Sequence, residues 1–399
     1  MPDTADYLIV GGCAASVTFV LTPVVCKVAR RLDWVVAPDE RRVHKVPTPD
    51  VGGIAMFAGF LIALGMSRLL DAFDPLYSRN SEPLGVLVAA AIIFAVGLVD
   101  DVRNISAPAK VIGTVLAGSA LVYYGVTMFY FRVPLLDVFQ LADEWVPLVT
   151  IVWLLGMSQA INLIDGLDGL AAGIVAIASV AFFLYSTELQ NQGVLTRDSI
   201  GPLICIITAG ICLGFMPHNF NPAKIFMGDG GALLLGLLMA CATSVVGGRA
   251  DPVTQQRFGQ SYFFFAPLFI PLFILGVPIL DTLFAIVRRA TRRQGLATAD
   301  KGHLHHRLMN LGHGQRRSVL ILWLWTALLS AFVLYPVFTT GGATLATLGV
   351  LALGLGLYTV LHPEVRRSRA RLAAPTPTEQ PATNLATGSS ELEIPDRAR

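Results

Sequence analysis

Aspartates, histidines and basic residues gather in five polar segments that separate long apolar runs. The first segment, DERRVHKVPTPDVGG at 39–53, brings Arg41, His44 and Lys45 together shortly before a glycine pair. Prolines stiffen the backbone there, and glycines let it approach a ligand closely. Such a basic loop suits a phosphate or an anionic lipid headgroup. A basic membrane anchor followed by a turn is the alternative.

A pair of carboxylates closes the next apolar run, which ends in GLVDD. Asp100 and Asp101 at the mouth of a membrane helix are costly unless they are paired or bind a cation. They could hold Mg²⁺ or act as a base toward a phosphate, and a solvated helix cap is the alternative. Because neighbouring side chains on a helix point about 100° apart, we expect the two carboxylates to do different jobs.

The third segment, NLIDGLDGLAAG, carries Asn162, Asp165 and Asp168. A spacing of three residues places these polar groups on one helical face or one turn. A simple loop does not need two carboxylates inside so apolar a run. This segment therefore predicts part of a functional site.

The fourth segment, HNFNPAKIFMGDGG at 218–231, places Asp229 between glycines directly before an apolar run. That position suits a ligand for a hard cation beside phosphates. Asn219 could read the polar edge of a base, and Phe226 could stack on it. The alternative is a Pro/Gly turn that happens to contain one aspartate.

The fifth segment is long and basic, with RRATRRQG followed by ADKGHLHHRLMNLGH. His303, His305 and His306 lie within four residues of each other. Zinc would require convergent His, Cys or carboxylate ligands, and no cysteine is near in the sequence. Phosphate binding or proton handling is the favoured interpretation in this basic setting, with zinc and a solvated loop as alternatives. Asp281, inside an apolar run, predicts either a functional group or a pair with a neighbouring helix.

The elements that must position these segments are membrane helices. The chain is 54% hydrophobic and only 14% charged, against about 25% charged in soluble domains. Many apolar runs approach the roughly 20 residues that cross a bilayer as a helix, and none shows the alternation of a barrel strand. We expect about eleven spans, at 7–26, 51–70, 84–99, 109–128, 145–164, 170–186, 200–217, 232–246, 262–287, 318–336 and 342–361.

The basic residues orient these spans. With the N-terminus outside, 23 of the 29 Lys and Arg residues fall in the loops 27–50, 100–110, 218–228 and 288–317 and in the tail after 361, as the positive-inside rule requires of cytoplasmic loops. The expected fold is therefore an all-α polytopic membrane protein with a cytoplasmic C-terminus and an active site facing the cytoplasm. Residues 1–361 form its transmembrane domain, 129–144 could hold a small β-hairpin, and the tail 362–399 is expected to be disordered.

Together the segments supply basic groups for phosphates, aspartates for a divalent cation, and an Asn/Phe pair for a base. Phosphoryl transfer needs these parts. A transporter would instead place polar residues near the bilayer midplane in several spans, where Asp281 is nearly alone. A non-enzymatic scaffold has no use for so many aspartates on one face.

At these residues the chain resembles the polyprenyl-phosphate N-acetylhexosamine-1-phosphate transferase family, over about 7–361. The spacing in HLHHR is similar to the branch that makes polyprenyl-diphosphate N-acetylglucosamine; the muramoyl-pentapeptide branch, which usually has three consecutive histidines, ranks second. The resemblance implies transfer of GlcNAc 1-phosphate from UDP-GlcNAc to a polyprenyl phosphate, with release of UMP. It implies Mg²⁺ as the cofactor, with Mn²⁺ as a substitute, and a bacterial plasma membrane. No nucleic acid is expected, and a homodimer stays open.

The resemblance also implies roles for individual residues. Asp229 resembles the principal Mg²⁺ ligand, and Asp100 the base for the lipid phosphate, with Asp101 beside it. The residues that resemble uridine contacts or their polar neighbours are Lys45, Asn162, Asp165, Asp168, Asn219 and Phe226. The histidines at 303, 305 and 306 resemble groups near the diphosphate, and Lys110 matches a family lysine that follows the paired aspartates. Two departures are Ala232, where the family usually has Ser, and Asn104, where it often has Lys.

Overall fold

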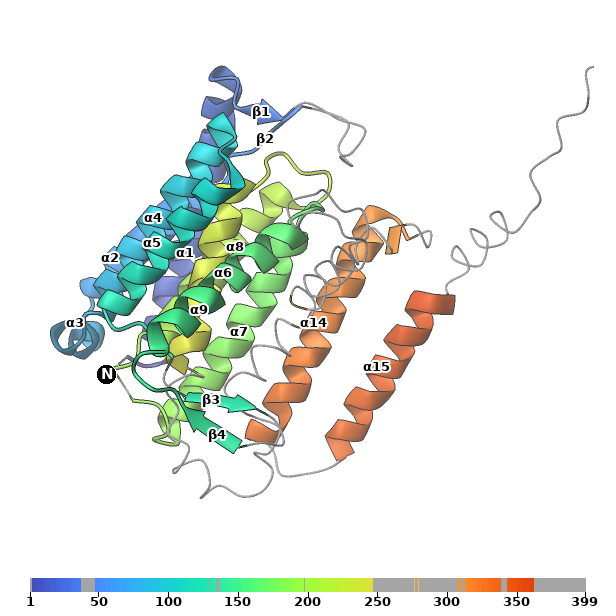
Figure 1. Ribbon diagram of the computed structural model, residues 1–399. Coiled ribbons are helices and arrows are strands. Elements are labelled where there is room, and N and C mark those ends of the chain that lie inside the picture. Colours follow the sequence, from blue (N-terminus) through green and yellow to red (C-terminus); the bar gives the residue numbers. More distant parts are fainter. Residues whose placement is uncertain are drawn as a thin grey trace, which may run out of the picture.

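The computed structural model describes residues 2–36, 47–128, 130–133, 137–196, 198–246, 276, 279, 308–309, 313–338 and 343–361. Helices dominate these ranges, and they run roughly parallel in one bundle (Figure 1). The longer helices are α1 (Thr4–Arg31), α2 (Gly53–Arg68), α4 (Glu82–Arg103), α5 (Ala107–Tyr123), α6 (Val146–Ile164), α7 (Leu170–Asn191), α8 (Gly201–Asn219), α9 (Gly228–Val246), α14 (Gln315–Phe338) and α15 (Ala343–Leu361). The short elements are η1 (Asp71–Phe73), α3 (Asp74–Arg79), β1 (Val35–Val36), β2 (Thr48–Pro49), β3 (Tyr130–Val133) and β4 (Asp137–Gln140).

Within the described ranges, seven helices are long and apolar enough to cross a membrane, or eight if α2 and the bent segment after it form one span. Two other apolar helical stretches are shorter: α5 (Ala107–Tyr123) and Thr347–Thr359, which is part of α15. The chain is therefore a helical, multi-pass membrane protein. The total of about eleven spans stays a prediction, because only Gly276 and Ile279 of the expected span at 262–287 belong to the described residues.

Local sequence signals explain where several helices begin and end. Asp3 and Asp6 form a capping box at the start of α1, each accepting a hydrogen bond of 2.9 Å from the backbone N–H of the other. Proline stands in the first turn of α4, α5, α6 and α8, where its missing N–H costs nothing. Asn104 ends α4 in the left-handed region with φ of 49°, a conformation that Asn tolerates better than most residues.

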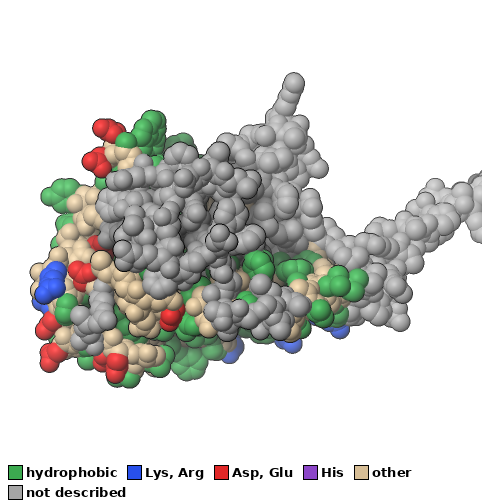
Figure 2. Space-filling model, turned by 90° about the horizontal axis from the view of Figure 1, so that it is seen from below, with side chains coloured by type: hydrophobic (Ala, Val, Ile, Leu, Met, Phe, Trp, Pro, Cys, Tyr) green, Lys and Arg blue, Asp and Glu red, His purple; other side chains and the backbone are tan. Residues whose placement is uncertain are grey.

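The expected hairpin between α5 and α6 is confirmed. Strands β3 and β4 pair antiparallel, with Tyr130 opposite Gln140 and Val133 opposite Asp137. This hairpin and the N-terminus lie at one end of the bundle, and the β1–β2 pair lies at the other (Figure 1). We call the end with β1 and β2 the site end. Figure 2 shows the opposite end, where Asp and Glu side chains recur along one edge together with Lys or Arg, apolar and neutral side chains.

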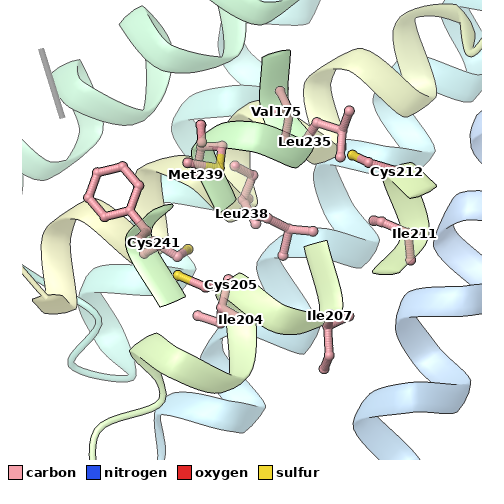
Figure 3. Packing of buried hydrophobic residues seen from close by; sticks show 14 of the residues in the cluster. Val175, Ile204, Cys205, Ile207, Ile211, Cys212, Leu235, Leu238, Met239 and Cys241 are labelled. Atoms are coloured by element: carbon pink, nitrogen blue, oxygen red, sulfur yellow. The ribbon is translucent and has the colours of Figure 1, made fainter. Parts of the chain in front are cut away.

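Helix α9 lies at the centre of the bundle, and 94% of its most apolar stretch is buried. Around it pack α2, α4, α6, α7 and α8. In this interior, Cys205, Cys212 and Cys241 lie among Ile, Leu and Val side chains (Figure 3). The cysteines are free and buried, so they serve as small apolar packing residues.

Glycines let three helices meet at the site end of α9. A Cβ atom on Gly97 of α4 would lie 2.5 Å from the Cα of Gly230, and one on Gly53 of α2 would collide with the backbone of Gly231. Small residues permit this close approach between membrane helices. The glycines around Asp229 therefore have a packing reason, and they fix the start of α9 against α2 and α4.

Candidate active site

The site end collects the ends of helices that are far apart in the sequence. Lys110, in the first turns of α5, places its ammonium 2.5 Å from Asp229 Oδ2 and 2.5 Å from Asp100 Oδ2. Asn162, near the end of α6, donates a 2.9 Å hydrogen bond to the other oxygen of Asp229. The structure thus brings together four of the predicted site residues, from α4, α5, α6 and α9.

Asp100 and Asp101 have different partners, as their adjacent positions on α4 predicted. Asp100 is 8% exposed, and its second oxygen accepts a 2.8 Å hydrogen bond from the backbone N–H of Ile105. Asp101 instead accepts the backbone N–H groups of Asp229 and Gly230, at 2.6 and 3.0 Å. Asp101 therefore caps the start of α9, where unpaired N–H groups attract a carboxylate.

Asp165 follows α6 directly and lies outside the membrane helices. Burial raises the pKa of its carboxyl well above the usual range, and the negative charges of Asp50, Asp229 and Asp101 raise the pKa further. The carboxylates of these four residues therefore repel one another, and a bound cation would relieve that repulsion. Asp50, inside the basic first segment, was missed by the motif reading; its position just before the glycine pair was the available signal.

Asn219 and Asp168 bind protein groups in this structure. Asn219 is 1% exposed; its carbonyl oxygen accepts from the N–H of Gly169 at 2.9 Å, and its amide nitrogen donates to the carbonyl of Ile225 at 3.0 Å. Asp168 accepts hydrogen bonds from Asn221 at 2.8 Å and from the N–H of Ala223 at 3.0 Å. Both side chains therefore tie the turn before α7 to the loop between α8 and α9.

Asn162, Asp165 and Asp168 were expected on one helical face or one turn, and of these alternatives the shared helical face is wrong for Asp168. Asn162 lies on α6 and reaches Asp229, whereas Asp168 lies in the turn after Asp165 and reaches the loop at 221–223. The α6 helix ends at Ile164, so helical spacing does not continue to Asp168. The chain bends, and the two groups contact different partners.

A further polar network, which motif reading did not single out, joins this loop to α14. The side-chain amide of Asn221 donates to Gln315 Oε1 at 2.8 Å. Arg316 Nε donates to the backbone carbonyl of Asn221 at 3.1 Å and to its Oδ1 at 3.2 Å. In the sequence, Arg316 was one of the basic residues of the loop 288–317, and its position there does not predict its partner.

The first and fourth segments pair through their backbones. The N–H of Phe226 donates to the carbonyl of Pro49 at 2.8 Å, and the N–H groups of Gly52 and Gly53 donate to the carbonyls of Phe226 and Met227 at 2.9 and 2.8 Å. Phe226 is half-buried. This pairing sets Asp50 beside the start of α9, because Asp50 precedes Gly52 by two residues.

Six predicted site residues lie outside the described ranges: Arg41, His44, Lys45, His303, His305 and His306. Asp281 and the tail 362–399 also lie outside them. Among the described residues, no group of three or more His, Cys, Asp or Glu side chains is arranged to hold a metal ion. In the described part of the site, Lys110 rather than a third acidic ligand stands between Asp100 and Asp229.

Comparison of the sequence with known proteins identifies the family of this chain. Residues 83–247 match Glycosyl transferase family 4. The chain is 38% identical, over 91% of both chains, to the decaprenyl-phosphate N-acetylglucosaminephosphotransferase of Mycobacterium leprae. It is 35% identical, over 76% of this chain and 78% of the relative, to a probable undecaprenyl-phosphate N-acetylglucosaminyl 1-phosphate transferase of Bacillus subtilis.

A more distant similarity reaches the second branch. The chain is 32% identical to the phospho-N-acetylmuramoyl-pentapeptide-transferase of Desulforudis audaxviator, over 88% of this chain and 99% of the relative. The N-acetylglucosamine relatives from Mycobacterium leprae and Bacillus subtilis are more similar to this chain, at 38% and 35% identity. The chain belongs to glycosyl transferase family 4 and, within it, to the polyprenyl-phosphate N-acetylglucosamine-1-phosphate transferases.

Proposed function

We propose that this protein transfers N-acetylglucosamine 1-phosphate from UDP-GlcNAc to a polyprenyl phosphate at the cytoplasmic face of a bacterial plasma membrane. In this reaction the phosphoanhydride bond between the sugar-bearing phosphate and UMP breaks, and UMP leaves with the electron pair. A new phosphoanhydride bond joins the sugar-bearing phosphate to the lipid phosphate. The products are polyprenyl-diphospho-GlcNAc and UMP.

The observation that carries the proposal is the Asp100–Lys110–Asp229 cluster at the site end. Lys110 and Asp229 are 119 residues apart in sequence, and their side chains are in contact. The cluster is partly open, since the side chains of Lys110 and Asp229 are each 26% exposed. Ammonium and carboxylate groups at the end of a membrane bundle suit a reaction between a water-soluble nucleotide sugar and a phosphate on a lipid.

The residues also fit a Mg²⁺ cofactor. Asp229, Asp100 and Asn162 offer carboxylate and amide oxygens, which are ligands that this hard cation prefers. Proteins commonly hold Mg²⁺ with one or two carboxylates and leave the other positions to substrate phosphates and water. A bound Mg²⁺ would neutralise charge on the donor diphosphate. Asn162 would hold Asp229 in position through its 2.9 Å hydrogen bond, and Asp101 would hold the backbone on which Asp229 stands.

The orientation has two supports. Of the 29 Lys and Arg residues, 23 lie in 27–50, 100–110, 218–228, 288–317 and the tail after 361; this asymmetry supports a cytoplasmic position for the site end, to which the described residues of 100–110 and 218–228 belong. A cytoplasmic site end would also face the compartment from which a nucleotide-activated sugar comes.

The test is a donor panel with the purified full chain, polyprenyl phosphate and Mg²⁺. We expect UMP release and a lipid product with the mass of polyprenyl-diphospho-N-acetylhexosamine from UDP-GlcNAc. UDP-muramoyl-pentapeptide serves as the second donor, because the chain also resembles that branch. Preference for the muramoyl donor would overturn the branch, and absence of UMP release from every donor would overturn the activity.

The Asp229→Asn variant tests whether the Asp100–Lys110–Asp229 cluster takes part in the reaction. Asn keeps an oxygen that can accept from Asn162, so the variant should fold, while its neutral side chain binds a hard cation poorly. We expect turnover to fall by about 10²-fold or more. Near-normal turnover at saturating Mg²⁺ would remove Asp229 from the site.

A further inference from the structure

The ammonium group of Lys110 stands where a cation is needed. It lies 2.5 Å from one oxygen of Asp100 and 2.5 Å from one oxygen of Asp229. The other oxygen of each carboxylate already has a partner, the N–H of Ile105 for Asp100 and the amide of Asn162 for Asp229. In this structure, therefore, a positive charge from the chain itself balances two carboxylates that would otherwise repel each other.

A divalent cation at Asp229 would compete with this ammonium. Mg²⁺ binds carboxylate oxygens at about 2.0–2.1 Å, and the ammonium nitrogen is already 2.5 Å from Asp229 Oδ2. Two cations on the same oxygen repel strongly in a partly buried site, where the effective dielectric constant is well below that of water.

Lys110 can move without a change in the backbone. Its ammonium is carried on a flexible four-carbon stem, and the side chain is 26% exposed, so it has an open direction. The residue stands on α5, whereas both carboxylates belong to other helices. The ammonium can therefore leave Asp229 while α4, α5 and α9 keep their packing.

We propose that Lys110 is an exchangeable counter-ion of the metal site: its ammonium balances Asp100 and Asp229 in the metal-free protein, and a divalent cation displaces it. The proposal rests on the proposed function for the identity of the cation. The displaced ammonium, still tethered beside Asp100, then becomes available to a phosphate of either substrate. Lys110 thus lowers the affinity for the metal alone and favours a metal that arrives with the diphosphate.

The test measures divalent cation binding to the full chain without any substrate. Mn²⁺ is titrated into wild type and Lys110→Met, and free Mn²⁺ is followed by electron paramagnetic resonance; calorimetry repeats the measurement with Mg²⁺. Because methionine removes the charge and keeps an unbranched stem, we expect Mn²⁺ to bind about tenfold more tightly or better in Lys110→Met. Equal or weaker binding in a folded Lys110→Met would overturn the proposal.

Two matched variants separate the local exchange from general charge effects. Lys224→Met removes an exposed lysine near the same end, and it should bind Mn²⁺ as wild type does. Lys110→Arg keeps the positive charge, so it should also stay near the wild-type affinity. If Lys224→Met gained as much affinity as Lys110→Met, or if Lys110→Arg bound like Lys110→Met, the specific exchange would be wrong.

Thermal unfolding keeps the proposal testable if the methionine variant is fragile. Without metal, Lys110→Met leaves two facing carboxylates with no counter-ion, so its Tm should fall below that of wild type. Mg²⁺ should raise the Tm of Lys110→Met more than that of wild type, because cation binding is linked to folding. An equal Mg²⁺ response in both proteins would contradict the exchange. These readouts need no turnover, so a failure of the donor panel would leave them standing.

Discussion

The carboxylate of Asp101 caps the helix that carries Asp229, across 128 residues of sequence. It accepts from the N–H of Asp229 at 2.6 Å and from the N–H of Gly230 at 3.0 Å. Helix N-termini are usually capped by the residue just before them; here the cap comes from the end of α4. The adjacent Asp100 meets Lys110 instead. One carboxylate of the pair thus holds the backbone of the site, and its neighbour faces the cation cluster.

Replacement of Asp101 by Asn should therefore destabilise the protein. Asparagine has one acceptor oxygen, and its NH₂ group would face the second backbone N–H. Loss of a helix cap costs about 0.5–2 kcal/mol, so Tm in detergent should fall by a few degrees. Asp143→Asn, on an exposed residue in the loop before α6, is the control and should leave Tm unchanged. An unchanged Tm in Asp101→Asn with lost turnover would instead put this carboxylate in the chemistry.

The glycine contact between α4 and α9 makes a prediction with a matched control. A Cβ on Gly97 would meet backbone atoms of Gly230, 2.5 Å from its Cα, whereas a Cβ on Gly65 of α2 would meet nothing within 4 Å. Gly97→Ala should destabilise by about 1–3 kcal/mol, as overpacking does. Gly65→Ala should be neutral or should stabilise by up to about 1 kcal/mol, since alanine favours the helix. Equal Tm values for both variants would show that α4 can move away from α9.

Asn219 should contribute to stability rather than to donor binding alone. Asn219→Ala leaves the N–H of Gly169 and the carbonyl of Ile225 without their partner in a buried place. Each unsatisfied group costs about 1–3 kcal/mol, so Tm should fall clearly. Asn191→Ala, at the exposed end of α7, is the control. A raised KM for UDP-GlcNAc with an unchanged Tm would show that Asn219 contacts the nucleotide and not the scaffold.

The role of Asp100 can be tested by the pH dependence of Asp100→Asn. Asparagine can still accept the hydrogen bond from Ile105, so the fold should persist. The second pKa of a phosphate monoester is about 6, and at higher pH the lipid phosphate needs no base. If Asp100 is that base, the loss of rate should be largest near about pH 6 and should shrink toward about pH 9.

The change of the rate loss with pH in Asp100→Asn decides whether Asp100 is the base. General-base catalysis contributes about 10²–10⁴-fold, so the recovery with pH should be easy to see in UMP release. A loss that stays constant over this range would assign Asp100 to holding Lys110 or the metal. The wild-type profile, measured with the same lipid, is the reference.

Topology gives a prediction about the whole chain. The concentration of basic residues in 27–50, 100–110, 218–228, 288–317 and the tail after 361 predicts that these segments face the cytoplasm. Alkaline phosphatase fused after residue 399 should therefore be inactive in cells, and the same enzyme inserted between β3 and β4 should be active, because that hairpin lies at the opposite end (Figure 1). The reverse result would invert the orientation and exclude a cytoplasmic site.

The sequence by itself determined the class of the fold, and it singled out Asp100, Lys110, Asn162 and Asp229, which the structure brings together. The short apolar runs at 84–99 and 232–246 proved to be parts of the longer helices Glu82–Arg103 and Gly228–Val246. Apolar residues mark the part of a helix that lies in lipid, whereas backbone hydrogen bonding continues into polar ends such as GLVDD and GDGG. The positions of these two helices were therefore predictable, and their ends were not.

Only the tertiary structure decided which polar side chain meets which. The sequence predicts that Asp100 and Asp101 do different jobs but not which partner each one has, and it presents Asn219 as an open amide. Their partners, Lys110, the N-terminus of α9 and the turn before α7, come from distant segments. Helical periodicity is a local property that reports which residues share a face. A cap, a buried amide and an ion pair across helices depend on which helices pack together, and the close glycine contacts at the start of α9 fix that choice.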